Sequence, residues 1–310
     1  MPAGTSTPSP TRPRILDPGD ARGITFALLS AFGLGIGIAV ARYAYEGGTN
    51  GLTVASARSL VLAAVLFLYC RATGRSVHLG RTDRRRCACL GVLMAMAFYG
   101  NVGAVEFISI GLTALLFFTF PPLIGVIQAV LDRAWPETAK VVALAIAFGG
   151  LATMLGVSLG ASDPRGVALV LGASLAVALN SVGIVRLVGH INPLVGMFHM
   201  ALTSAVALPV LTLVTGSVKL PETGLGWVGM LVVIAVQCAA LPLYFVAVAR
   251  IGALKTAVLA NLQPVTSIAA ARVLFGELLS ITQLVGGAMV LAGIVIMQWH
   301  DGRTKRRSAS

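Results

Sequence analysis

Ten long apolar runs dominate the sequence, and each is close to the length that one helix needs to cross a bilayer. A hydrocarbon core of about 30 Å requires roughly 20 apolar residues, because an α-helix rises about 1.5 Å per residue. The runs are continuous, whereas a membrane β-strand alternates apolar and polar residues at every second position. The chain is therefore predicted to be an all-α integral membrane protein with ten transmembrane helices.

The predicted helices fill most of the chain and leave only short loops between them. They span Gly23 to Tyr43, Leu52 to Tyr69, Cys87 to Ser109, Leu112 to Leu131, Val141 to Val157, Gly166 to Leu187, Leu194 to Thr215, Trp227 to Ala249, Ala253 to Leu274 and Thr282 to Trp299. Residues 1–22 are rich in Pro, Ser and Thr and are predicted to form a disordered tail. Residues 300–310 are predicted to form a basic tail.

The orientation in the membrane follows from the positions of Lys and Arg, which accumulate in cytoplasmic loops. With both termini in the cytoplasm, eighteen of the 23 basic residues face the cytoplasm, four face outward, and Arg58 lies within the membrane. The net charge of +12 is then explained by basic loops beside an anionic lipid leaflet, and no nucleic-acid partner is expected. The predicted location is the bacterial inner (plasma) membrane.

Cofactors, metals and catalysis find little support in the residue types present. Only 11% of residues are charged, against about 25% in soluble proteins, and no phosphate-binding Gly-rich loop for ATP is present. Cys87 and Cys89 stand in a Cys-x-Cys pair, but no further His or Cys lies near enough in the sequence to complete four ligands. We expect neither an enzyme nor a bound cofactor or metal.

The two halves of the chain repeat one another. Matching features are Gly23 and Gly166, Arg42 and Arg186, Asn50 and Asn192, Ile110-Gly111 and Ile251-Gly252, Pro122 and Pro264, and Gly150 and Gly293, at offsets between 141 and 144. Residues 23–157 and 166–299 are therefore predicted to be two copies of one five-helix unit. Five is an odd number, so the second copy enters the membrane from the opposite side. Such inverted repeats are typical of secondary transporters, whose solute site lies near the bilayer midplane.

The order of features within each unit resembles the EamA-type transporters of the drug/metabolite transporter superfamily. The resemblance rests on Arg58, on the turns that lead to Pro122 and Pro264, on Gly276-Glu277, and on the Gly-rich last helix. The first copy has Ala134-Trp135 where Gly-Glu is expected. The resemblance implies export of small metabolites such as amino acids, or of toxic compounds, by secondary transport without ATP.

Ionisable groups inside the bilayer are candidates for gating or coupling, because each costs about 2.5–3.5 kcal/mol on insertion scales. Arg58 and Glu106 are predicted to meet in the outer half of the membrane, with Arg42 at the rim. Arg186 corresponds to Arg42 in the repeat, and His199 falls within a residue of the Arg58 position. Two polar clusters, one outer and one inner, could act as alternating gates. A static Arg58–Glu106 pair and a buried structural His199 are the competing interpretation.

A solute pocket is predicted where polar groups and helix breaks share the midplane. The polar candidates are Tyr99, Asn101, Asn180, Gln237, Asn261 and Gln263. The proline candidates for helix breaks are Pro121, Pro122, Pro242 and Pro264. For a single amide, a hydrogen bond to a neighbouring helix is the favoured role, whereas the shared depth of the group favours a pocket. Gly33 and Gly37 are spaced for close helix packing.

The predicted function is therefore a secondary transporter that exports small organic metabolites, amino acids or related amphiphilic compounds, by alternating access. A drug efflux protein of the same fold and a non-transporting membrane scaffold or sensor remain alternatives. Protons are a candidate coupling ion, whereas facilitated diffusion or solute exchange needs no titratable group. The solute, the direction of transport, the coupling and the oligomeric state do not follow from the sequence.

Overall fold

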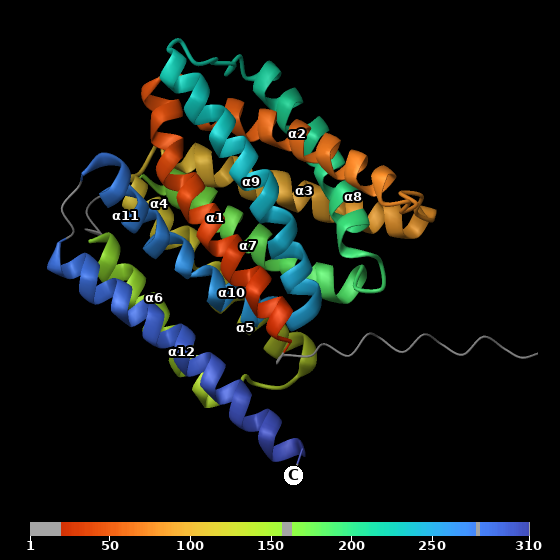
Figure 1. The fold of residues 1–310 in the computed structure, drawn as a ribbon, viewed down its shortest axis with the longest axis vertical. Helices are drawn as coiled ribbons and strands as arrows, with labels where there is room; N and C mark the ends of the chain where they lie inside the picture. The colour runs from red at the N-terminus through yellow and green to blue at the C-terminus, as the bar shows by residue number, and fades with distance from the viewer. Residues whose placement is uncertain (1–19, 157–162, 277–279, 310) are drawn as a thin grey trace, which may run out of the picture.

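The computed structural model describes residues 20–156, 163–276 and 280–309 (Figure 1). All regular secondary structure in these ranges is α-helical, and ten spans are long and apolar enough to cross a membrane. Each of the ten helices expected from the sequence has a counterpart. The predicted fold class is confirmed.

Twelve helices make up the ten spans, because two spans are each divided in two. The first copy comprises α1 (Ala21–Glu46), α2 (Gly51–Ala72), α3 (Arg81–Ala104), α4 (Ile110–Phe117), α5 (Phe120–Asp132) and α6 (Thr138–Leu155). The second comprises α7 (Pro164–Leu187), α8 (Pro193–Val214), α9 (Gly224–Ile251), α10 (Ala253–Ala260), α11 (Leu262–Phe275) and α12 (Ile281–Ala309). The pairs α4 with α5 and α10 with α11 each form one span.

The repeat extends to the residues that start the helices. Asp20 and Asp163 cap the first helix of each copy, and each carboxylate accepts a hydrogen bond from a backbone N–H of the first turn. Asn50 and Asn192 do the same for the second helices. A side-chain acceptor at this position satisfies one of the backbone donors that a helix start leaves open. Equivalent capping residues therefore start equivalent helices in the two copies.

The third span begins and ends earlier than expected. It was predicted from Cys87 to Ser109, but α3 runs from Arg81 to Ala104 and is followed by a turn that contains Glu106. Its first turns are charged and can lie outside the hydrocarbon, so an apolar run does not mark where the helix starts. As a result, Tyr99 and Asn101 lie in the last two turns of α3 rather than near its centre.

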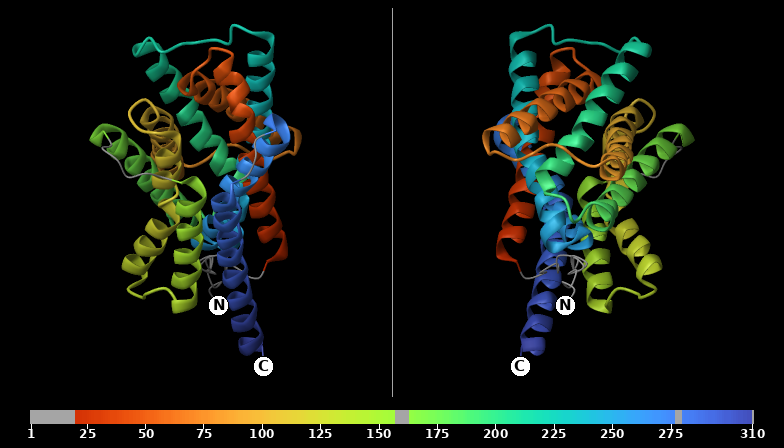
Figure 2. Two further views of the ribbon diagram at one scale, coloured as in Figure 1. Left: turned by 90° about the vertical axis from the view of Figure 1, so that its left-hand side faces the viewer. Right: turned by 90° about the vertical axis from the view of Figure 1, so that its right-hand side faces the viewer.

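The ends of the chain differ in part from the predicted tails. The helix α1 already begins at Ala21, and residues 1–19 of the expected N-terminal tail lie outside the described residues. The helix α12 continues to Ala309, so the predicted C-terminal tail is helical through that residue. In Figure 2, α12 extends beyond the other helices at the end of the bundle where α1 begins. We call this end the termini face, and the end that holds residues 47–50 the opposite face.

Helices of one copy pack mainly on helices of the other. The first helix of each copy lies along the third helix of its partner copy, as α1 on α9 and α7 on α3. The second helices, α2 and α8, pack on each other, and so do the fifth helices, α6 and α12 (Figure 1). These pairings obey one pseudo-twofold axis, which is the arrangement expected of inverted repeats.

Small residues allow the closest of these contacts. A Cβ atom added to Gly150 of α6 would lie 2.6 Å from the carbonyl oxygen of Gly286 in α12, and one added to Gly286 would lie 2.5 Å from the carbonyl oxygen of Gly150. No side chain fits between these two backbones. Close backbone approach through glycine is a common way for helices to associate in lipid, where apolar burial alone gives no driving force.

The outer surface of the bundle is strongly apolar. Large side chains such as Ile110, Val130 and Val273 are 73%, 70% and 83% exposed, and they belong to the broken spans. A water-soluble protein rarely exposes contiguous apolar surface on this scale. This surface identifies the chain as a multi-pass membrane protein whose outer side chains face lipid.

Candidate functional site

The first helix break lies between α4 and α5. Pro121 and Pro122 occupy the first turn of α5, where proline is tolerated because those N–H groups have no partner within the helix. Thr119 lies in the break, and its hydroxyl donates to the carbonyl of Leu116 at 2.7 Å. The same hydroxyl lies 2.7 Å from that of Ser174 in α7. The break in the first copy is therefore attached to the first helix of the second copy.

The second helix break lies between α10 and α11, at Asn261, with Pro264 in the following turn. It is attached to α1 by close contact. A Cβ atom added to Gly35 would lie 1.7 Å from the Thr266 hydroxyl and 2.5 Å from the Gln263 carbonyl oxygen. The two breaks therefore have equivalent surroundings, each against the first helix of the other copy.

Pro242 does not break its helix, which corrects the expectation from the sequence. The helix α9 runs without interruption from Gly224 to Ile251 through Pro242, and α8 likewise continues through Pro209. A single proline removes one backbone hydrogen bond, and packing against neighbouring helices is sufficient to hold the remaining turns in place.

One polar contact between the copies within the membrane is made by the charged side chain of Arg58. It lies seven residues into α2, about 10 Å along the helix from the opposite face. Its Nη1 donates a hydrogen bond to the Oε1 of Gln237, at the centre of α9. The guanidinium carbon also lies 3.8 Å from the ring centroid of Phe98 in α3. This Arg58 site joins three helices and both copies.

Gln237 is held in place by the closeness of α1 to α9. A Cβ atom added to Gly37 of α1 would lie 3.2 Å from the Gln237 Cγ, so the glutamine side chain lies directly on the glycine backbone. Next to it, the thiol of Cys238 lies 3.8 Å from the carbonyl oxygen of Arg58. Gly33 also faces α9, against Ala240, so the predicted packing role of Gly33 and Gly37 is confirmed.

The positive charge of Arg58 has no carboxylate partner among the residues that the structure describes. Its Nε is buried and has no hydrogen-bond partner there. The expected Arg58–Glu106 pair is not formed, because Glu106 lies exposed in the turn that follows α3. A neutral amide and an aromatic ring therefore surround a cation at membrane depth.

The other predicted pocket residues are placed separately. The Nδ2 of Asn180 donates to the Leu90 carbonyl at 2.7 Å and ties α7 to α3. Asn261 is buried at the second break, and Gln263 accepts a hydrogen bond from Thr266 through its backbone carbonyl. Tyr99 packs in a small apolar cluster, and Asn101 lies half-buried near the end of α3. Within the described part of the chain, Gln237 is the member of this set that contacts Arg58.

The predicted gate residues are also held by separate partners. Arg42 pairs with Glu46 one turn later in α1, at 2.7 Å. Arg186 pairs with Asp132 at the end of α5. The Nε2 of His199 donates to the Val77 carbonyl at 2.8 Å, which favours the structural interpretation of this histidine.

Sequence reasoning missed several polar contacts, and three of them lie beside predicted site residues or at helix ends. They are Arg58 with Phe98, Ser181 with Tyr244 at 3.1 Å between α7 and α9, and Asp20 with Arg250 at 2.6 Å between the ends of α1 and α9. Ser181 follows Asn180, and Phe98 precedes Tyr99. Both therefore adjoin candidates, but which face of the helix each occupies depends on helix rotation, which the apolar pattern does not specify.

The Asp20–Arg250 ion pair closes the termini face between α1 and α9. The hydrogen bond from Arg250, with backbone N–H bonds at the helix start, holds the pKa of Asp20 below its ordinary value. Beside it, a Cβ atom added to Gly23 would lie 2.5 Å from the Ile251 side chain. At the opposite face, Asp163 and Gly166 match Asp20 and Gly23, but the residues against Gly166 are Phe107 and Ile108, and no described residue forms an ion pair with Asp163.

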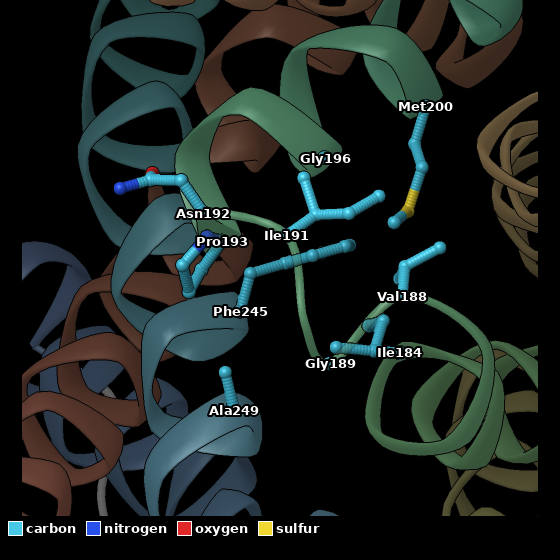
Figure 3. Close-up of a pocket in the computed structure, with 10 residues that line it drawn as sticks. All are labelled: Ile184, Val188, Gly189, Ile191, Asn192, Pro193, Gly196, Met200, Phe245 and Ala249. Carbon is cyan, nitrogen blue, oxygen red and sulfur yellow. The ribbon is translucent and has the colours of Figure 1, made fainter. Parts of the chain in front are cut away.

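A small pocket opens near the termini face between α7, α8 and α9. Its empty volume is about 270 Å³, part of which is open to the surroundings. Figure 3 shows Met200, Ile191 and Phe245 pointing into this space, while the amide of Asn192 points away from it. The enclosed part has room for about one water molecule, far less than the ~300 Å³ at which ligand pockets begin, and the walls are apolar. We interpret it as a packing gap between the helix ends.

The model of the EamA-like transporter family matches residues 21–156 and 164–299, which are the two five-helix copies. The chain belongs to the EamA-like transporter family. One solved crystal structure covers 88% of this chain, and the match spans 96% of that chain, with a TM-score of 0.72 and 14% sequence identity. At this identity the likeness shows the fold alone. No curated protein matches the chain.

Membership of the EamA-like family relates the paired helices and the two helix breaks to transport. The Arg58 site lies at the interface between the two EamA repeats, which is where solute sites occur in transporters built from inverted copies. Among the described residues, no group of three or more His, Cys, Asp and Glu side chains could hold a metal ion. All four cysteines are free.

Proposed function

We propose that this EamA-like protein is a secondary transporter that exports a small organic solute by rocking one repeat against the other. The observation that carries the proposal is the charge of Arg58, placed at membrane depth on the interface between the repeats and without a described carboxylate partner. Such a charge costs about 2.5–3.5 kcal/mol on insertion scales. A role in solute binding would explain why a charge with this cost is present at the interface.

The two helix breaks support a moving interface. Each divides a span, and each contacts the first helix of the other repeat, through Thr119 and Ser174 on one side and through Gly35 and Thr266 on the other. Movement of one repeat would therefore bend the broken span of its partner. Bending at a break costs less than bending a continuous helix, because fewer backbone hydrogen bonds have to change.

Alternation also requires that the two faces open at different times. In the conformation described here, the Asp20–Arg250 pair joins α1 to α9 at the termini face. We propose that this face is cytoplasmic and that the pair must open when solute enters from the cell interior. The excess of Lys and Arg at this face supports that orientation.

Proton coupling of transport would require a titratable group at the solute path. Glu106, the candidate carboxylate for proton coupling, is exposed and outside the helix, and the structure offers no partner for it among the described residues. Facilitated diffusion and solute exchange are therefore proposed ahead of proton coupling.

Reconstituted flux is the test of this function. The full-length protein in liposomes is offered labelled amino acids, organic acids and amphiphilic drugs, with protein-free liposomes as the control. Saturable flux of at least one solute is expected. Flux restricted to amphiphilic drugs would favour the drug-efflux alternative. No flux of any solute, beside a working transporter reconstituted in parallel, would favour the scaffold or sensor.

A further inference from the structure

One edge of the Arg58 guanidinium is hydrogen-bonded within the protein, and the other edge has no hydrogen-bond acceptor among the described residues. Its Nη1 donates to Gln237, while Nε is buried without a partner. None of the described residues accepts a hydrogen bond from Nη2 either. The Nε and Nη2 groups form the edge of the guanidinium that binds a carboxylate through two parallel hydrogen bonds. The protein therefore presents a two-pronged donor within the membrane.

We infer that this edge of Arg58 binds the carboxylate of the solute, and that the protein transports organic anions or zwitterions with a free carboxylate. The inference rests on the proposed function and adds the chemical class of the solute to it. A buried donor without a partner destabilises the empty protein, because the group has lost its hydrogen bonds to water. A carboxylate at the Arg58 edge would supply both the missing hydrogen bonds and the missing negative charge.

The neighbours of Arg58 hold the guanidinium without neutralising it. The guanidinium carbon lies 3.8 Å from the centroid of the Phe98 ring, and this ring offers no hydrogen-bond acceptor to the buried Nε. A cation–π contact of this kind restrains the guanidinium while leaving its charge uncompensated. Gln237 fixes its rotation through Nη1. Such a preorganised fork loses less freedom when a planar carboxylate binds.

Gln237 also makes the site depend on both repeats. Its Oε1 accepts from Arg58, and its Nε2 amide group donates to none of the described residues. It lies on α9 against Gly37, so movement of α9 relative to α2 changes the hydrogen bond to Arg58. The affinity of Arg58 for solute would therefore depend on the relative position of the repeats.

The test compares carboxylates with amides of the same shape. Thermal unfolding of the full-length protein in nanodiscs is measured with phenylacetate, indole-3-acetate, hexanoate and N-acetylated amino acids, each beside its primary amide. We expect at least one carboxylate to raise the melting temperature while its amide does not. The inference is overturned if the amides stabilise as well as the acids, or if no carboxylate in the panel stabilises at all.

Variants then assign the effect to one residue. Arg58→Met should abolish the stabilisation by the carboxylate, and Arg58→Lys, which keeps the charge but loses the planar fork, should weaken binding about tenfold. Lys219→Met is the control, because it removes a positive charge that lies exposed beyond α8. If Arg58→Met does not fold, Arg58→Lys alone decides. Unchanged carboxylate binding in the folded Arg58 variants contradicts the assignment.

Flux separates this inference from the proposed function. A wild-type protein that transports amides or amines but no carboxylates would overturn the inference and leave transport standing. Carboxylate binding that requires Arg58, without flux of any solute, would support the inference and contradict the proposed transport function.

Discussion

Arg58 and Glu106 have very different surroundings although the sequence suggests that they pair. Hydropathy places both near one end of the membrane, but it cannot say that α3 ends at Ala104 and leaves Glu106 in a turn. The contact that Arg58 does make, with Gln237, crosses between residues 179 apart in the chain. At the scale of single residues, the sequence indicates which side chains are unusual for a membrane, but it does not indicate which residues they contact.

The position of Glu106 predicts a small effect of its removal. Glu106→Gln should leave both the expression level and the initial rate of flux in liposomes unchanged, because the side chain is exposed and holds no described partner. Loss of flux with normal expression would return Glu106 to the mechanism.

The Asp20–Arg250 pair predicts a difference between two equivalent caps. Asp20→Asn keeps a good N-cap but removes the charge that binds Arg250. Asp163→Asn makes the same change at a cap that forms no ion pair with any described residue. Only Asp20→Asn should lower the stability at neutral pH, by about 1 kcal/mol or less because the pair is partly exposed. Thermal unfolding of both variants in detergent checks this, and equal losses would contradict it.

The same pair predicts a direction for the effect of pH. Because the folded pKa of Asp20 is lowered, its stabilising effect is fully present above the ordinary carboxyl pKa and is lost as the pH falls through the lowered value. The difference in stability between wild type and Asp20→Asn should therefore stay constant between about pH 5 and 8 and shrink in stronger acid. A difference that shrinks near neutrality would assign the effect to another group.

At the scale of helices, the apolar runs and the repeat were sufficient to place nine of the ten spans within about three residues at each end. Prolines were a poorer guide. Pro121 and Pro264 adjoin real breaks, whereas Pro242 and Pro209 lie in continuous helices. The difference comes from tertiary packing, because a proline removes the same hydrogen bond in every case and only the neighbours determine whether the helix continues.

Gly35 predicts how closely α1 must approach the second break. In Gly35→Ala the new methyl group would meet the Thr266 side chain and the Gln263 backbone, so α1 and α11 must separate. We expect lower thermal stability by about 1–3 kcal/mol, as for other overpacked sites, together with slower flux. Gly172→Ala in α7 is the matched control, because nothing lies within 4 Å of its added Cβ. Equal behaviour of the two variants would show that α11 adapts freely.

The hydroxyl of Thr119 predicts a coupling between the first break and α7. Thr119→Val removes the bond to the Leu116 carbonyl and leaves the buried Ser174 hydroxyl without this partner. The expected loss is about 1–2 kcal/mol of stability, measured by thermal unfolding beside flux. The control is Thr153→Val on the exposed face of α6, where the hydroxyl bonds within its own helix. A smaller effect at Thr119 than at Thr153 would contradict the role of this contact.

At the scale of the whole molecule, the inverted arrangement could be predicted because two independent observations agreed on it. The odd number of helices per copy and the distribution of basic residues both required it, and the helix pairings show it. Which faces of the helices meet could not be predicted. Nearly all outward and inward residues here are apolar, so hydrophobic periodicity carries little information on helix rotation.

The orientation of the whole molecule can be tested with single cysteines. In a variant lacking the four native cysteines, Lys219→Cys should react with a membrane-impermeant maleimide in intact cells, and Arg75→Cys only after permeabilisation. Lys219 is exposed and Arg75 is partly exposed, and they lie in the loops that precede α9 and α3, respectively. The reverse labelling pattern would place the termini outside the cell.

The Asp20–Arg250 pair also bears on the energies of the end states. Two identical halves would give a molecule that is equally stable with either face open, so that it would rest with no preference. Here Arg250 has no equivalent among the described residues, because Phe107 lies against Gly166 where Arg250 lies against Gly23. The empty protein should therefore rest with its termini face shut, and a single substitution in one half of a duplicated chain is enough to set that resting state.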